Sequence, residues 1–237
     1  ASNFLSGAIP FNFGDKDEIT YLNLSNNKFE GKIPTSFGNL KKLQYLNLSQ
    51  NKLTGKIPVE LGELNLYRLN LENNQLIGEI PSELGNLVNL VHLDLESNKL
   101  TGRIPSSIGK LSKLMDLELH NNYLSGEIPA AIKGCKKLKK INLTNNNLTG
   151  KIPEELTDLN KLTSLNISFN AFYGIVPAKI FQNKNIESLL LHSNNFSGII
   201  SNNFCKDGRN KKILIYDNSF CPPFPDCIKF IGAQKCK

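Results

Sequence analysis

Short pairs of apolar residues recur along nearly the whole chain. The pair Leu22 and Leu24, in the pattern Leu-x-Leu, returns at steps of 24 residues as far as Ile213 and Ile215, with one step of 23. Alternation with a period of two predicts a short strand that turns one face towards a core. One such coil cannot bury its apolar face alone, so neighbouring coils must stack. The pattern therefore predicts a solenoid of about ten coils, roughly 45 Å long because parallel strands lie about 4.8 Å apart.

A single asparagine is the most regular polar position in the repeat. A buried asparagine at a bend can satisfy backbone N–H and C=O groups that have no partner in a strand. Four residues later a glycine recurs, from Gly7 to Gly198, and an Ile-Pro pair usually follows, which predicts a tight turn. We therefore expect a stacked asparagine ladder made of Asn3, Asn27, Asn51, Asn74, Asn98, Asn122, Asn146, Asn170, Asn194 and Asn218.

The full pattern, L-x-x-L-x-L-x-x-N-x-L-x-G-x-I-P-x-x-L-G-x-L, resembles the plant-type leucine-rich repeat. Segments 37–40 (Phe-Gly-Asn-Leu), 61–64 (Leu-Gly-Glu-Leu) and 84–87 (Leu-Gly-Asn-Leu) carry its convex half, and the resemblance covers residues 1–220. It is the repeat of plant receptor-kinase ectodomains and of polygalacturonase-inhibiting proteins. The resemblance implies an α/β solenoid, a right-handed superhelix with a concave parallel β-sheet and short extra strands around the Gly-x-Ile-Pro segments.

The last residues, 221–237, depart from the repeat and contain Cys221, Cys227 and Cys236 in a proline-rich context. Together with Cys205 they predict a disulfide-bonded C-terminal cap, for which three pairings are possible. Similar angular positions on adjacent coils favour Cys205–Cys227 with Cys221–Cys236. A zinc site is the alternative, although the spacings match none of the usual ligand patterns.

Two further features concern the core. Cys135 occupies a position filled by leucine in other coils, so we expect a buried, unreactive thiol rather than a reactive one. The chain opens inside a repeat and lacks the paired-cysteine N-terminal cap that family members carry. An uncapped coil would expose core side chains to water, so we expect a longer natural chain.

The formal net charge of +7 raises the question of a nucleic-acid partner. The positions expected on the concave face nevertheless hold six basic and six acidic residues, and no aromatic residues interleave with the basic clusters elsewhere. We therefore predict no nucleic-acid partner. The excess of positive charge lies outside the concave face, where it is either solvated lysine or a surface that attracts an acidic cell-wall polysaccharide.

Acidic residues and histidines gather on two neighbouring coils. In the expected register Asp94 faces Glu118, His92 faces Asp116, and Glu96 faces His120. Like charges opposite each other are unfavourable, so the arrangement calls for a cation from outside. It predicts a patch that recognises a basic peptide or protein segment; the alternatives are a divalent metal ion or a solvated face with local His–carboxylate pairs. The predicted ligand-binding residues are Arg68, Glu72, His92, Asp94, Glu96, Asp116, Glu118, His120 and Tyr123.

A second concave patch, in the last three coils, is apolar, and exposed apolar residues on one face often mark contact sites. The alternative is contact of some of them with the C-terminal cap. The patch consists of Phe169, Ala171, Leu190, Leu214 and Tyr216. Six sequons, together with the cysteines, favour an extracellular location and a glycoprotein. The candidate glycosylation sites are Asn23, Asn47, Asn142, Asn147, Asn166 and Asn195.

Catalytic motifs are absent from the sequence: there is no phosphate-binding glycine loop and no Gly-x-Ser-x-Gly or His-Glu-x-x-His motif. All three histidines are expected on the surface sheet. No stretch approaches the roughly 18 apolar residues of a membrane span. We therefore predict a non-catalytic extracellular scaffold without a cofactor that binds a protein or peptide through its concave face, as in a receptor ectodomain. The alternative is a secreted defence protein that resembles a polygalacturonase inhibitor.

Overall fold

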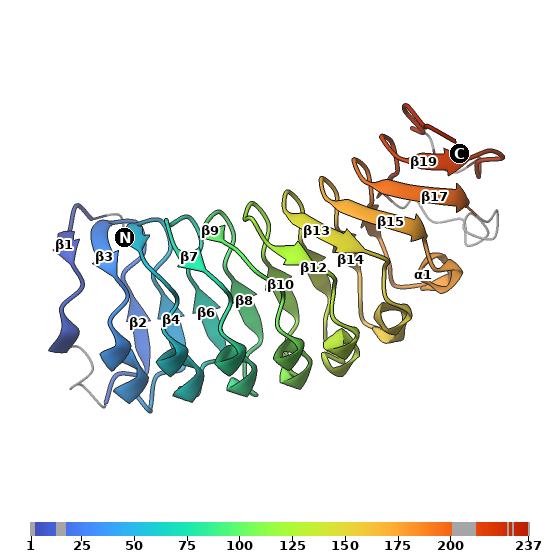
Figure 1. Ribbon diagram of the computed structural model, residues 1–237. Coiled ribbons are helices and arrows are strands. Elements are labelled where there is room, and N and C mark those ends of the chain that lie inside the picture. The colour runs from blue at the N-terminus through green and yellow to red at the C-terminus, as the bar shows by residue number, and fades with distance from the viewer. Residues whose placement is uncertain (1–2, 13–17, 201–211, 227, 229, 237) are drawn as a thin grey trace.

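The computed structural model describes residues 3–12, 18–200, 212–226, 228 and 230–236. Its main sheet has nine parallel strands, one per coil, in the order β18-β16-β14-β12-β10-β8-β6-β4-β2. Figure 1 shows the coils side by side in a curved row. Each strand has three residues, and its middle residue points into the core. The strands are β2 (Tyr21–Asn23), β4 (Tyr45–Asn47), β6 (Arg68–Asn70), β8 (His92–Asp94), β10 (Asp116–Glu118), β12 (Lys140–Asn142), β14 (Ser164–Asn166), β16 (Ser188–Leu190) and β18 (Lys212–Leu214).

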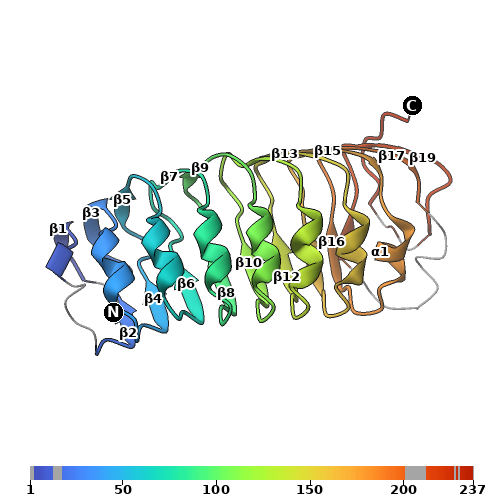
Figure 2. The ribbon, with the colours of Figure 1, turned by 60° about the horizontal axis from the view of Figure 1, so that its bottom comes forward.

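A row of short helical turns forms the opposite, outer side of the solenoid, in front of the strands in Figure 2. Each turn begins directly after the Pro of an Ile-Pro or Val-Pro pair, which fixes the backbone before it. Glycine lets adjacent turns approach closely: a Cβ atom on Gly62 would lie 2.3 Å from the carbonyl oxygen of Glu83. The 3-10 helices are η2 (Thr35–Asn39), η3 (Val59–Glu63), η4 (Ser82–Asn86), η5 (Ser106–Lys110), η6 (Ala130–Gly134) and η7 (Glu154–Asp158), and the α-helix is α1 (Ala178–Gln182).

Short strands after the ladder asparagines form a third side, as the family resemblance implies. They pair in three parallel groups, β1-β3-β5, β7-β9 and β11-β13-β15-β17-β19. Their bounds are β1 (Ser6–Ala8), β3 (Lys28–Lys32), β5 (Lys52–Thr54), β7 (Ile77–Gly78), β9 (Lys99–Leu100), β11 (Ser125–Gly126), β13 (Asn147–Gly150), β15 (Ala171–Ile175), β17 (Asn195–Ile199) and β19 (Ser219–Cys221). Among the described residues, no helix has the length and apolarity to cross a membrane.

The asparagine ladder has the predicted role. The Asn98 side-chain amide donates to the carbonyl oxygens of Leu71 at 3.0 Å, Leu95 at 3.2 Å and Glu96 at 3.1 Å. Its Oδ1 accepts the backbone N–H of Leu76, also at 3.0 Å. One side chain thus satisfies backbone groups of its own coil and of the preceding coil, which ties adjacent coils together.

Cys135 is fully buried, as expected, and its Sγ donates to the carbonyl oxygen of Ile108 at 3.0 Å. Burial raises the pKa of this thiol to about 11, so it stays protonated at neutral pH. In the first coil, by contrast with this buried position, two aromatic side chains are exposed to solvent: Phe4 by 85% and Phe11 by 80%.

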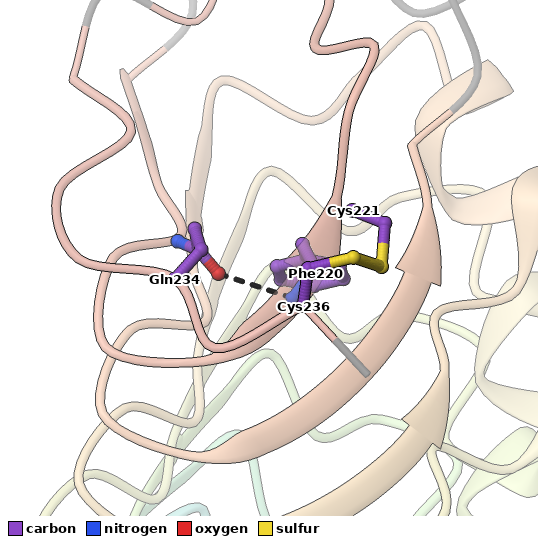
Figure 3. Close-up of a disulfide and its surroundings, with 4 residues drawn as sticks. All are labelled: Phe220, Cys221, Gln234 and Cys236. Atoms are coloured by element: carbon purple, nitrogen blue, oxygen red, sulfur yellow. Dashed lines mark hydrogen bonds between the residues drawn. A yellow bond between two sulfur atoms is a disulfide. The ribbon is translucent and has the colours of Figure 1, made fainter.

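The C-terminal cap contains the disulfide Cys221–Cys236, one of the two pairs expected from the sequence (Figure 3). Cys205 and Cys227, the other expected pair, lie outside the described residues. Gln234 continues the ladder into the cap: its Oε1 accepts the N–H of Phe220 at 3.1 Å, and its Nε2 donates to the Ile215 carbonyl oxygen at 3.0 Å. A glutamine thus replaces the ladder asparagine where the chain leaves the repeat.

Candidate functional site

The third residue of each concave strand offers an internal reference for identifying a site. At this position, Asn47 accepts the N–H of Ser49 on its side-chain oxygen at 2.9 Å, and Asp94 accepts the N–H of Glu96 in the same way at 3.2 Å. The bend therefore needs only an asparagine. Five strands have Asn there, namely Asn23, Asn47, Asn70, Asn142 and Asn166, whereas the other four have Asp94, Glu118, Leu190 and Leu214.

The first two departures belong to what we call the acid–histidine cluster: Glu72, His92, Asp94, Glu96, Asp116, Glu118 and His120. The pairing of β8 with β10 sets Asp94 opposite Glu118 and His92 opposite Asp116, which is the predicted register.

The two histidines make the expected local contacts with carboxylates. His92 Nδ1 lies 2.6 Å from Asp116 Oδ2, and His120 Nε2 lies 2.7 Å from Glu96 Oε2. The other ring nitrogen of His120 lies 3.4 Å from Glu118 Oε2. The cluster is half-buried, so these charges interact more strongly than they would in bulk water.

The electrostatics show that the carboxyl groups are crowded. Burial, followed by a side-chain hydrogen bond with Glu72, raises the pKa of Asp94 to about 8. Burial also raises the pKa of Glu96, against the lowering effect of His120. For His120 burial lowers the pKa, but the hydrogen bond to Glu118 and the nearby carboxylates outweigh it, so the net shift is upward. Asp94 therefore holds a proton at neutral pH.

Arg68 forms no ion pair with the carboxyl groups of this cluster. Among the described residues, no carboxylate oxygen lies within 4.0 Å of its guanidinium group, and its buried Nε has no hydrogen-bond partner. The guanidinium carbon instead lies 5.9 Å from the centre of the Tyr45 ring, a cation–π distance. Beside it is a hollow of about 180 Å³ with a largely charged lining, made by Arg68, His92, Leu93, Asp94, Asp116, Glu118 and Lys140.

Two sets of three potential metal ligands lie within the cluster, each with its ligand atoms within 4.8 Å of one another. One consists of Glu96, Glu118 and His120, the other of Glu72, Asp94 and Glu96. A mixed set of imidazole and carboxylate suits a divalent transition metal ion, and a set of carboxylates alone suits a hard cation. The carboxylate oxygens of either set can also accept hydrogen bonds from an ammonium or guanidinium group.

Tyr123, the remaining predicted binding residue, is 57% exposed and lines a different hollow, again of about 180 Å³, together with ladder and surface asparagines. Of the sequon asparagines, Asn23, Asn147 and Asn195 are exposed, and Asn47, Asn142 and Asn166 are half-buried. The Asn142 amide nitrogen lies 3.0 Å from His120 Nδ1, so a glycan on Asn142 would disturb that contact. Glycosylation stays a prediction.

The apolar patch at the C-terminal coils adjoins a residue that the sequence analysis placed wrongly. His192, expected on the exposed sheet, is only 6% exposed, because its ring lies against Phe169 and Tyr216. Phe169 itself is 54% exposed, and Ala171 is also exposed. Leu190, Leu214 and Tyr216 are half-buried, and Tyr216 contacts Phe230 of the cap.

Comparisons with known proteins agree with this fold. A family model described as leucine-rich repeat region matches residues 61–212, and one described as leucine rich repeat matches residues 1–53 and 17–76. A comparison with curated proteins finds no match.

Several solved structures are similar. The plant peptide hormone receptor RGFR1, in complex with RGF2, is 35% identical with a TM-score of 0.88; the match covers 92% of this chain and 39% of the receptor chain. The Arabidopsis receptor kinase HAESA, in complex with the peptide hormone IDA and the co-receptor SERK1, is 33% identical with a TM-score of 0.88, covering 93% of this chain and 37% of that one. A plant ice-binding protein is 28% identical with a TM-score of 0.81, covering 98% and 77%.

The chain thus spans well under half the length of the two receptor chains that it matches. The repeat, the ladder and the two family models agree over nearly all of the described coils. The chain belongs to the leucine-rich repeat family, and its repeats are of the plant type.

Proposed function

We propose that this chain is a recognition segment of an extracellular, non-catalytic leucine-rich repeat protein, and that its acid–histidine cluster binds a basic peptide or protein segment. One observation carries the proposal. Asp94 and Glu118 stand where other coils satisfy the same bend with asparagine, and they bring carboxyl groups together at a cost to the free protein. The fold does not require these acids, which points to a ligand.

The chemistry of the ligand follows from the charges. Five carboxyl groups face two imidazoles, and among the described residues no lysine or arginine forms an ion pair with them. A guanidinium group matches this surface well, because its planar fork of donors binds carboxylate oxygens in pairs. The hollow of about 180 Å³ beside Asp94 and Glu118 is lined by three carboxyl groups and by the two basic side chains Arg68 and Lys140, so acidic groups outnumber basic ones there.

The similar structures support the same class of partner. RGFR1 and HAESA are described in complexes with peptide hormones, and both align with nearly all of this chain. The match covers only part of each receptor, so a peptide ligand for this chain rests on the acid–histidine cluster and the similarity together.

Selection from a displayed library of random 12-residue peptides tests the proposal. Peptides selected on the unaltered protein should be enriched in arginine and lysine. Their affinity should fall at least tenfold on the variant Asp94→Asn/Glu118→Asn, which restores the residue found in other coils. The variant Glu154→Gln/Asp158→Asn is a matched control, because it removes two exposed acids from the outer helix η7. Selected peptides without basic residues, or equal affinity for all three proteins, would overturn the proposal.

A further inference from the structure

A row of aromatic rings crosses the C-terminal end of the concave face. The rings of Phe169 and His192 meet edge to face at 5.1 Å, and those of His192 and Tyr216 stack at 4.4 Å. Tyr216 then meets Phe230 of the cap edge to face at 5.2 Å. Three successive coils and the cap therefore contribute to one continuous row of aromatic rings, in which His192 is buried.

Phe169 has a backbone conformation that is unfavourable for a bulky side chain. Its φ of 51° lies in the left-handed region, at a position held in the other coils by Asn26, Gln50, Asn73, Ser97, Asn121, Asn145, Ser193 and Asp217. Asparagine and aspartate tolerate this region best, whereas a bulky side chain is strained there. Phe169 is also 54% exposed, so burial in the core compensates only partly.

Two leucines extend the same surface. Leu190 and Leu214 replace the asparagine of the concave strands and are neighbours in the register of β16 with β18. Neither can accept the N–H of the following bend as asparagine does. His192 also has an unsatisfied polar atom, because its buried Nδ1 has no hydrogen-bond partner among the described residues. Stacking on Tyr216 rather than a hydrogen bond at this atom holds the ring.

We call Phe169, Leu190, Leu214 and Tyr216, with the buried ring of His192 between Phe169 and Tyr216, the apolar strip. It lies on the same concave side of the solenoid as the acid–histidine cluster. Only β12 and β14 separate β10 from β16. The outward residues between the two patches are polar: Lys140, Asn142, Ser164 and Asn166. Three steps between adjacent strands amount to roughly 14 Å, which an extended peptide covers in about four residues.

We infer that the apolar strip is the second half of one ligand site, and that the ligand is a single extended peptide with an aromatic or large aliphatic side chain about four residues from its basic residue. This inference rests on the proposed function. The charge of the adjoining cluster identifies the basic end of the ligand, and the strip selects its apolar end. If the ligand had a basic segment alone, the apolar strip would have no part in binding it.

Synthetic peptides test the inference directly. The probes are fluorescein-labelled Ser-Gly peptides with one Arg-Arg pair and one Phe, placed four residues before the pair, four after it, or ten after it. A matched peptide has Ser in place of Phe. Fluorescence anisotropy should show at least tenfold tighter binding for one of the two four-residue peptides than for the Ser peptide, and no such gain at ten residues.

The variant Phe169→Asn/Leu190→Asn identifies the source of that gain. On this variant the Phe peptide should bind no more tightly than the Ser peptide, because the apolar side chains that contact Phe are gone. Circular dichroism and thermal unfolding show whether the variant is folded, and restoring the repeat residues should not lower its melting temperature.

The outcomes separate the two proposals. Equal binding of the Phe and Ser peptides overturns the inference alone, provided that the Ser peptide still depends on Asp94 and Glu118. A gain from Phe that survives in Phe169→Asn/Leu190→Asn also overturns it. If binding of the Ser peptide does not depend on Asp94 and Glu118, or if no peptide binds, the proposed function is overturned as well.

Discussion

The acid–histidine cluster and the apolar strip are two regions of one sheet that depart from its repeat in opposite chemical directions. The cluster replaces asparagine with Asp94 and Glu118 and crowds carboxyl groups, whereas the strip replaces it with Leu190 and Leu214 beside a strained Phe169. The ladder asparagines do not vary in the complete coils, because the backbone of every coil needs them. In a repeat protein, a costly departure at a position where the common residue suffices is a sign of function.

The largest expected effect concerns the ladder. Asn122→Ala removes four hydrogen bonds, to Leu95, Leu119, His120 and Leu100. It leaves buried backbone groups unsatisfied, so the free energy of unfolding should fall by about 3 kcal/mol. Urea unfolding followed by circular dichroism measures this. If the loss is no larger than that of an exposed Asn145→Ala control, the ladder lacks the role assigned to it.

The next largest effect concerns how Asp94 of the acid–histidine cluster changes the stability of the protein with pH. Asp94 has a folded-state pKa of about 8 against an ordinary value of 3.8, so its contribution to stability is full below pH 4 and is lost as the pH rises through 8. Asp94→Asn mimics the protonated group and should raise the unfolding free energy by about 2 kcal/mol at pH 9, with little effect at pH 4. Urea unfolding at both pH values checks this. A variant less stable than the unaltered protein at pH 9 would contradict the assignment.

Binding should respond to the same titration. A basic ligand favours ionised Asp94, and His120, whose pKa is raised, loses positive charge as the pH rises. Affinity for an Arg-containing peptide should therefore increase about tenfold between pH 6 and pH 8, with release of protons on binding. Calorimetry in buffers of different ionisation enthalpy measures both quantities. The Asp94→Asn variant is the control, and its pH dependence should be smaller.

The smallest effect concerns the strip. Phe169→Asn removes the strain of a bulky side chain in the left-handed conformation and should stabilise the protein by about 1 kcal/mol. Ser193→Ala, at the same position one coil later, is the comparison, and it should be neutral or slightly destabilising. Thermal unfolding distinguishes them; a lower melting temperature for Phe169→Asn would show that its ring contact with His192 stabilises the fold.

The period of the sequence predicts much of this structure, because one coil determines its neighbours. The strands, the ladder and the opposition of His92 to Asp116 and of Glu96 to His120 all follow from positions in the repeat. Periodicity fails where the contacting residues do not recur from coil to coil. Gln234 enters the ladder only 16 residues after Asn218, since the cap folds back, and rings from two other coils cover His192.

Side-chain choices among nearby partners also escape the sequence. Arg68 lies over Tyr45 rather than pairing with an acid, and Asp94 forms a hydrogen bond with Glu72, a residue of the preceding coil. Both depend on local distances and burial. The fold itself does not select a ligand, because the similar structures include both peptide hormone receptors and an ice-binding protein.

The most direct test restores the repeat residue at all four departing positions, in the variant Asp94→Asn/Glu118→Asn/Leu190→Asn/Leu214→Asn. Its unfolding free energy and its affinity for peptides selected on the unaltered protein would be measured side by side. We predict a protein at least as stable as the unaltered one that has lost binding at least a hundredfold. A variant that binds the same peptides equally well, or that unfolds more readily, would contradict the claim that these residues serve binding rather than folding.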